Sequence, residues 1–229
     1  DLWPLETVHI MCCFLGAFSS TFTVTMNAPK ESHLSKQLTA QMQSAAPEGR
    51  SMALLDFLGE RGQKFHYEEV TQLEHALQCA ALAEAANVGH TLITSALLHD
   101  IGHLLVDEED DQEGMMDGDS YHEETGADFL AMFFPPQVTD PIRLHVPAKR
   151  YLCTMNNDYW DSLSEASRQS LAVQGGKMSP QEKIRFEKNP DLNDALRLRI
   201  WDDQAKIPGC ATLPLQHYTN MVRHCLTSN

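Results

Sequence analysis

A histidine–aspartate pair inside an apolar stretch of the chain limits the folds that this sequence can adopt. His99-Asp100 lies in ALLHDIGHLL, whose leucines and isoleucine have the spacing of a buried helix. A charged carboxylate in such a helix costs several kcal/mol unless it is paired or bound to a metal ion. His103 follows His99 by one turn and shares its helix face. The pair therefore predicts a helical core built around a polar centre.

The remaining secondary-structure signals also indicate helices, and strand signals are nearly absent. Apolar residues at helical spacing predict helices over residues 51–60, 71–87, 90–106 and 191–206. Capping residues predict further helix starts at Ser120, Asp140, Ser162 and Ser179, and a helix end at Gly175-Gly176. We therefore expect an all-α protein in which residues 51–207 form one helical bundle.

Both ends of the chain differ in composition from this bundle. The apolar run in residues 1–25 is shorter than the roughly 20 residues of a membrane span, and the segment has no Lys or Arg for a signal peptide. We interpret it as an upstream extension, with a docking strand or a hydrophobic anchor as the alternative. Residues 27–50 are polar, so the whole of 1–50 is expected to be a poorly ordered tail. Residues 208–229 are expected to form a C-terminal tail.

The charge of the chain argues against several classes of partner. Its 229 residues include 17 Lys and Arg against 32 Asp and Glu, which gives a net charge of −15. Nucleic acids and anionic membranes bind basic surfaces, so neither is expected as a partner. No obligate protein partner is evident either. The acidic run from Asp107 to Asp119 has Gln112 where a calcium-binding EF-hand loop requires glycine, so we expect a solvated loop there.

The cysteines indicate the cellular compartment. None of the six forms a CxxC pair, and their spacing is irregular for a framework of disulfides. The sequence therefore predicts reduced thiols in a cytoplasmic protein.

Histidines and aspartates recur on the predicted helices or at their ends. The candidates are His75, His99, Asp100, His122, His145 and Asp202. Side chains from facing helices can converge inside a bundle, which is how bundle cores hold metal ions. A set of imidazoles and carboxylates without thiolate suits iron, manganese or nickel. Asp203 is adjacent to Asp202 and remains an alternative ligand.

The ordered pattern of His75, His99-Asp100 and a distal Asp202 resembles the HD-domain superfamily of helical metalloproteins. The additional His122 and His145 match the subset that binds two metal ions. The resemblance implies that one metal ion is held by His75, His99, Asp100 and Asp202. It implies that the other is held by Asp100, His122 and His145, with Asp100 bridging the two.

Several longer stretches are similar to one branch of this superfamily, the phosphonate-degrading HD oxygenases. These stretches are VTQLEHALQ, ALLHDIGHLL, LHVPAKRYL, SLSEASRQSLAVQGG and LRLRIWDD. The GYP signature of the cyclic-dinucleotide branch is missing from YHEETGADFL. The resemblance implies a mixed-valence Fe(II)/Fe(III) pair as cofactor and O2 as co-substrate. The implied reaction breaks the carbon–phosphorus bond of a small organophosphonate and releases phosphate.

The resemblance also implies where the phosphonate binds. Lys149 follows His145 by four residues and Arg199 precedes Asp202 by three, so each shares a helix face with a predicted ligand. These two cations and His103 would bind phosphonate oxygens, and Ser167 and Gln174 would assist as polar groups. Asp100, His103 and Tyr67 are the residues expected to take part in catalysis.

The other end of the substrate is expected near residues 65–69. The family has a mobile tyrosine and an amine-binding glutamate there. Glu68 matches the position of the glutamate. Phe65 occupies the position of the tyrosine, and Tyr67 lies two residues further along the chain. The substrate would be 1-hydroxy-2-aminoethylphosphonate or its trimethylammonium analogue, giving glycine or glycine betaine. Aromatic rings bind quaternary ammonium groups through cation–π attraction, which favours the trimethylated compound.

Three other functions compete with this interpretation. An HD phosphohydrolase would release phosphate from a nucleotide or phosphate ester without O2, with manganese or nickel. A metal-binding regulator without activity would be expected to have an incomplete ligand set, whereas the set here is complete. An oxygenase of the myo-inositol type would act on a polyol, but Lys149, Arg199 and His103 favour an anionic substrate.

Overall fold

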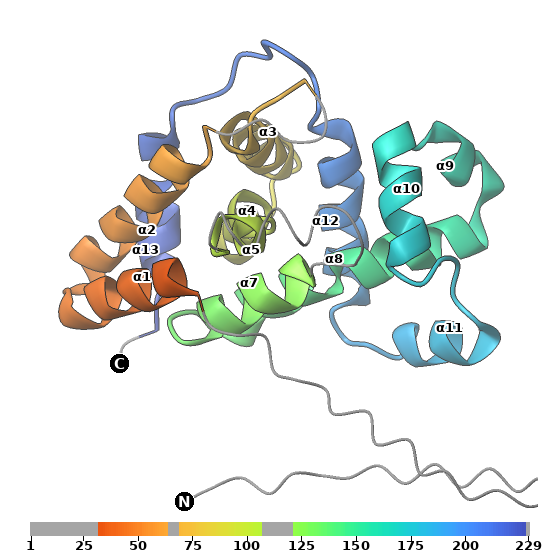
Figure 1. The fold of residues 1–229 in the computed structure, drawn as a ribbon, viewed down its shortest axis with the longest axis horizontal. Coiled ribbons are helices and arrows are strands. Elements are labelled where there is room, and N and C mark those ends of the chain that lie inside the picture. Colours follow the sequence, from red (N-terminus) through yellow and green to blue (C-terminus); the bar gives the residue numbers. More distant parts are fainter. Residues whose placement is uncertain (1–31, 64–68, 107–120, 228–229) are drawn as a thin grey trace, which may run out of the picture. The chain divides into compact units, whose positions relative to one another are not determined.

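The computed structural model describes residues 32–63, 69–106 and 121–227, all within the compact unit Glu31–Asn229. These residues form helices and connecting segments, with no strand among them, and the predicted all-α fold is confirmed (Figure 1). None of the described helices is both long and apolar enough to cross a membrane. Phe65, Tyr67, Glu68 and the acidic run 107–119 lie outside the described residues.

The helices follow one another with short connections. In chain order they are α1 (His33–Ser44), α2 (Pro47–Arg61), α3 (Gln72–Ala85), α4 (His90–Leu98), α5 (Ile101–Leu104), α7 (His122–Ala131), α8 (Pro136–Met155), α9 (Asn157–Ser162), α10 (Glu165–Val173), α11 (Pro180–Phe186), α12 (Leu192–Gln204), the 3₁₀ helix η1 (Leu215–Tyr218) and α13 (Thr219–Cys225).

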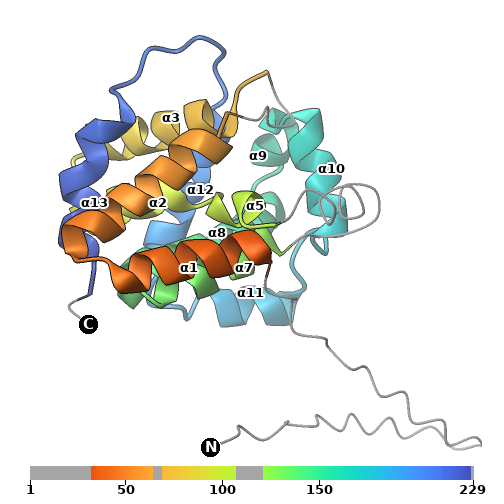
Figure 2. The same cartoon turned by 60° about the vertical axis from the view of Figure 1, so that its left-hand side comes forward.

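The core lies around α4, in which every residue from Leu92 to Leu98 is buried. Helix α4 packs against α3, α8, α12 and α13, and Figure 1 shows α3 and α4 nearly end-on, between α12 on one side and α2 and α13 on the other. Leu97, Leu98, Ile142 and Leu198 are among its fully buried side chains. Burying each such residue contributes about 1.5–3 kcal/mol. Figure 2 shows α1 and α2 side by side at the edge of this core.

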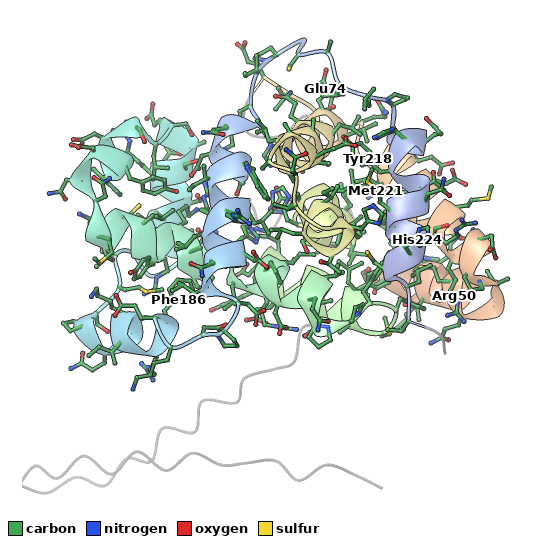
Figure 3. The ribbon with its side chains drawn as sticks, turned by 180° about the vertical axis from the view of Figure 1, so that it is seen from behind. Arg50, Glu74, Phe186, Tyr218, Met221 and His224 are labelled. Carbon is green, nitrogen blue, oxygen red and sulfur yellow. The ribbon has the colours of Figure 1, made fainter. Side chains whose placement is uncertain are left out.

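A second, smaller group of helices, α9 to α11, packs on α8 away from the main core (Figure 1). Its apolar clusters centre on Leu163 and Leu171 and on Phe186, whose ring lies 5.3 Å from that of Tyr151. Figure 3 shows Phe186 on α11, far from Tyr218 at the opposite end of the molecule. Helix α10 of this group carries Ser167 and Ser170, whose hydroxyls accept hydrogen bonds from Lys206 and Lys149.

The loose tail predicted up to residue 50 is wrong for residues 33–50, which belong to α1 and the start of α2. The Ser32 hydroxyl caps α1 by accepting a hydrogen bond of 3.0 Å from the Ser35 amide. Leu38 and Met42, one turn apart, are buried in the core. The mostly polar composition hid this narrow apolar stripe.

The C-terminal tail predicted over 208–229 also contains ordered helix. Leu215, Tyr218, Val222 and Cys225 are buried. Their separations of three, four and three residues are helical, so a period test on this segment would have found η1 and α13. Figure 3 shows Tyr218 and Met221 on this part of the chain.

Several helix boundaries in the structure differ from those that the sequence predicted. Ser162 ends α9, and the cap of α10 is Ser164, which accepts from the Ser167 amide. Asp140-Pro141 does not start a helix, because α8 already begins at Pro136 after Pro135 and contains Pro141 in its interior. The start predicted at Ser120 lies outside the described residues, and α7 begins at His122.

Other boundary predictions hold. Ser179 is the N-cap of α11, as predicted, and it also forms a capping box with Glu182. Gly175 and Gly176 both have positive φ and close α10, with the Gly176 amide bonded to the Leu171 carbonyl at 2.8 Å.

Candidate metal centre

The apolar segment around the His99-Asp100 pair is not one continuous helix. Helix α4 ends at Leu98 and α5 begins at Ile101, and Asp100 between them has φ −100° and ψ 10°. The predicted helix over 90–106 is therefore broken at the pair itself. This break directs the Asp100 carboxylate into the space between α3, α7, α8 and α12, where the other candidate ligands converge.

Two pairs of histidines face each other in this space. The Nε2 atoms of His75 on α3 and His99 are 3.2 Å apart. The Nε2 atoms of His122 at the start of α7 and His145 on α8 are 3.1 Å apart. All four rings are buried.

Asp100 lies between the two pairs and contacts all four rings. Its Oδ2 is 3.5 Å from Nε2 of His75. Its Oδ1 is 3.5 Å from Nε2 of His99, 3.4 Å from that of His122 and 3.7 Å from that of His145. Such a carboxylate can bridge two metal ions, one beside each histidine pair.

The hydrogen bonds of the rings show which nitrogen atoms can bind metal. Nδ1 of His75 lies 2.9 Å from the Ala205 carbonyl, that of His99 3.0 Å from Ala96, and that of His145 2.7 Å from Ile142. A carbonyl only accepts, so in each neutral ring Nδ1 carries the proton and Nε2 presents a lone pair. Facing lone pairs repel each other unless a cation lies between them. The donor set therefore fits metal ions.

Burial keeps the second pair neutral. Burial, with the neighbouring His103, lowers the pKa of His122 well below its usual value. Burial, and then the nearby His99, lower the pKa of His145 to about 4. Neutral imidazole is the form that binds metal. The Glu123 carboxylate, 3.5 Å from Nδ1 of His122, is placed to orient that ring.

The structure separates Asp202 from Asp203. Oδ1 of Asp202 is 3.5 Å from Nε2 of His75, and its Oδ2 accepts a hydrogen bond of 2.7 Å from Arg199. Asp203 instead accepts from Arg199 and from the Tyr159 hydroxyl. Burial would raise the pKa of Asp202, but Arg199, Lys206 and the two histidines hold it well below its usual value. Asp202 is thus the aspartate at the centre.

Arg199 is not directed into an open pocket. Its guanidinium is buried and bonds both aspartates, with a further contact of 3.3 Å to the Tyr159 hydroxyl. Burial opposes its charge, but the two aspartates raise the pKa of Arg199 well above its usual value. The arginine therefore positions the carboxylate of Asp202.

Two lysines and two serines form a cationic cluster next to the candidate metal centre. Lys149 on α8 donates a hydrogen bond of 2.8 Å to Ser170, and Lys206 after α12 donates one of 3.2 Å to Ser167. Lys149 and Ser167 are buried. Burial and the charge of Arg199 lower the pKa of Lys149 to about 7. The sequence predicted Lys149 and Ser167 but missed Lys206 and Ser170, although Lys206 follows Asp202 by one turn.

Of the other predicted substrate contacts, His103 lies beside the second histidine pair. The ring of His103 stacks on that of His122, with centroids 4.0 Å apart. Gln174 ends α10, and its side-chain oxygen is buried with no hydrogen-bond partner in the described part of the chain. Tyr67, Glu68 and Phe65 lie outside the described residues, so their expected roles stay predictions.

Two neighbours of the centre were not singled out by the sequence. The Gln78 side chain donates to the Ile207 carbonyl at 3.0 Å and accepts from the Ile207 amide at 3.1 Å. We call these two bonds between Gln78 and Ile207 the amide clamp. The clamp fixes the chain after Lys206, and the bond between His75 and Ala205 fixes it before Lys206. The buried thiol of Cys79 lies 3.9 Å from Nε2 of His75.

A small pocket reaches Asp100 from the side of α2 and α3. It is lined by Leu58, Gln72, Ala76, Leu97, Asp100, Ile101 and Leu104. Apart from Gln72 and Asp100 these side chains are apolar. The centre therefore has a cationic side and an apolar side.

Comparison with known proteins agrees with this geometry. The HD-domain family model matches residues 73–174, which include the two histidine pairs and Asp100. The chain is 49% identical over 183 residues to the hydroxymethylphosphonate dioxygenase of Gimesia maris, covering 80% of this chain and 91% of that protein. The chain belongs to the HD-domain phosphonate dioxygenase family.

Two other relatives extend the comparison. The glycine-betaine-forming 1-hydroxy-2-(trimethylamino)ethyl phosphonate dioxygenase of Leisingera caerulea is 41% identical over 179 residues, covering 74% of this chain and 89% of that protein. An uncharacterized protein of Acanthamoeba polyphaga mimivirus is 38% identical over 169 residues, covering 73% and 77%. The family resemblance seen in the sequence is confirmed.

Proposed function

We propose that this protein is a dioxygenase that uses O2 to cleave the carbon–phosphorus bond of a 1-hydroxyalkylphosphonate. One observation carries the proposal: a carboxylate lies between two pairs of buried imidazoles, and a cluster of ammonium and hydroxyl groups lies beside them. The names of two relatives, both phosphonate dioxygenases, support it. The substrate and O2 become a carboxylate, hydrogen phosphate and a proton, which balances atoms and charge for the phosphonate dianion.

The cofactor we propose is a pair of iron ions in the Fe(II)/Fe(III) state. His75, His99, Asp100 and Asp202 would hold one ion, and Asp100, His122 and His145 the other. When bound, the iron pair would supply oxygen activation and one-electron chemistry that side chains lack. The carbonyls of Ala205, Ala96 and Ile142 hold three of the rings with Nε2 directed inward. These bonds fix the ligands before substrate binds.

The phosphonate binds, in this proposal, between α8, α10 and the end of α12. The ammonium groups of Lys149 and Lys206 already bond the hydroxyls of Ser170 and Ser167, so the cations and donors lie together. Phosphonate oxygens are strong acceptors for charged donors. Gln174 and His103 would complete this binding site. Arg199 contributes by orienting Asp202, and a direct bond from Arg199 to the phosphonate stays a prediction.

The apolar pocket on the other side of Asp100 suits O2. Five apolar side chains line it, and a charged phosphonate there would lose its hydration without compensation. A small nonpolar molecule has no such cost. The two co-substrates would therefore approach Asp100 from different sides.

The candidate substrates differ in the group bonded to the carbon that bears the hydroxyl and the phosphonate. The relative named for hydroxymethylphosphonate is 49% identical, against 41% for the one named for the trimethylated compound. Hydroxymethylphosphonate is thus the first compound to test, ahead of the trimethylammonium compound that the aromatic residues near Glu68 favoured. The expected cytoplasmic location stays a prediction.

The deciding experiment follows phosphate release from three compounds with and without O2. These are hydroxymethylphosphonate, 1-hydroxy-2-aminoethylphosphonate and its trimethylammonium analogue, each incubated with iron-loaded protein. Release that requires O2 supports the proposal, and the fastest compound identifies the substrate. Release without O2 would make the protein a phosphohydrolase. No release from any compound would refute the assigned substrate class.

A further inference from the structure

The thiol of Cys79 lies at the edge of the first histidine pair. Cys79 follows His75 by one turn of α3, and both side chains are completely buried. Its Sγ is 3.9 Å from Nε2 of His75. The ligand atoms of His75, Cys79 and His99 all lie within 4.8 Å of one another. The pair therefore has a soft sulfur donor beside it as well as its carboxylates.

These distances are close to those of a tetrahedral zinc site. Zinc binds imidazole at about 2.0–2.1 Å and thiolate at about 2.3 Å, so tetrahedral angles give about 3.4 Å between two nitrogens and about 3.6 Å from nitrogen to sulfur. The structure has 3.2 Å between the two Nε2 atoms and 3.9 Å from sulfur to His75. Oδ1 of Asp202, 3.5 Å from His75, supplies a fourth donor. The sulfur lies within 4.8 Å of the ligand atom of His99, so a shift of the Cys79 side chain by at most about 1.2 Å would complete the set of His75, His99 and Cys79.

We propose that His75, Cys79, His99 and Asp202 form a thiolate-containing site for Zn²⁺ at the first metal position. Thiolate donors select zinc and other thiophilic ions, whereas imidazole and carboxylate alone also suit iron. The thiol proton leaves to solvent when the ion binds. Zinc has no redox chemistry, so occupation by zinc blocks oxygenase activity. The inference rests on the proposed function only in treating this position as one that iron also occupies.

Cobalt(II) tests the site without substrate, O2 or iron. Metal-free protein titrated with Co²⁺ should show a thiolate-to-cobalt charge-transfer band in the near ultraviolet. The band should be lost in Cys79→Ala and Cys79→Ser. The matched control is Cys225→Ala, which should keep the band. Cys225 on α13 is another buried free cysteine, and its sulfur is contacted by the Thr94 hydroxyl. Zinc affinity in Cys79→Ala should fall by at least about 10-fold, the lower end of what losing even an outer-shell partner costs.

Wild-type protein without the band, or a Cys79→Ala variant that keeps it, would overturn the proposal. Far-ultraviolet circular dichroism verifies that each variant folds. X-ray absorption of zinc-loaded wild type needs no variant, and it should show one sulfur at about 2.3 Å; only nitrogen and oxygen neighbours would overturn the proposal. A protein that binds zinc through sulfur but releases no phosphate from phosphonates would fail the proposed function and still satisfy this inference.

Discussion

Asp100 contacts all four rings of the two histidine pairs. We therefore expect Asp100→Ala to lose both metal ions and all activity. Elemental analysis of the purified variant checks this. Asp203→Asn is the control, because Asp203 bonds Arg199 and Tyr159 rather than the rings, and it should keep most of its metal. Wild-type iron content in Asp100→Ala would contradict the bridging assignment.

The lowered pKa of Lys149 predicts that substrate capture depends on pH. Its pKa is lowered to about 7, first by burial and then by the charge of Arg199. The protonated amine attracts the phosphonate, so kcat/KM, which reports the free enzyme, should decline as this amine deprotonates above about pH 7. The Lys149→Arg variant keeps its positive charge over this pH range. Ionisation of the substrate affects both proteins equally, so it cancels when their kcat/KM values are divided. The ratio of wild-type to variant kcat/KM should therefore fall as pH rises; a ratio constant from about pH 6 to pH 9 would contradict the assignment.

The sequence predicted residues whose chemistry is unusual for their surroundings. Six histidines and aspartates on apolar helices were recognisable because buried polar groups require partners. Lys206 and Ser170 were not, because a lysine and a serine are ordinary on a helix surface and only the packing of α10 against α8 and α12 brings them together. Spacing placed Arg199 near Asp202 but could not show that two carboxylates hold its guanidinium.

At the level of elements, α5 and α7 touch through their backbones at Gly102 and Gly126. A Cβ at Gly102 would lie 2.0 Å from the His122 carbonyl oxygen and 3.0 Å from the Gly126 amide. Close packing here holds His103 against His122. The glycines are thus required for the position of the second histidine pair.

Gly102→Ala should push α7 away from Asp100. We expect a loss of about 1–3 kcal/mol in the free energy of unfolding, as for other overpacked sites, together with weaker metal binding. Denaturant unfolding and metal titration measure the two effects. Gly89→Ala is the control, because its Cβ would meet only the Thr91 hydroxyl at 3.9 Å. Equal stability of the two variants would show that the backbone contact is not needed.

Elements were predictable where caps and apolar spacing agreed. Thr71 with Glu74 forms a capping box before α3, close to the predicted start. The break between α4 and α5 was not predictable, because leucines and isoleucine on both sides continue the helical pattern through His99-Asp100. Helix α1 was missed because Leu38 and Met42 are few among polar residues. In each case tertiary packing decided the outcome.

At the level of the whole molecule, the contacts described for the centre are all made by residues of the unit Glu31–Asn229. A protein that begins at residue 31 should therefore keep its activity and melting temperature. Deleting residues 208–229 should prevent folding, because Leu215, Tyr218 and Val222 are buried and each contributes about 1.5–3 kcal/mol. Total stability is commonly only about 5–15 kcal/mol. Calorimetry of both truncations tests this, and a folded product of the second would contradict it.

The amide clamp of Gln78 and Ile207 lies where the chain leaves the metal centre for η1 and α13. A force applied at the carboxyl end would first peel away α13 and then η1. It would reach Ala205 and His75 only after breaking the paired bonds to Gln78. Tension on that end of the chain is therefore carried by the two bonds of the amide clamp before it reaches the bond between His75 and Ala205.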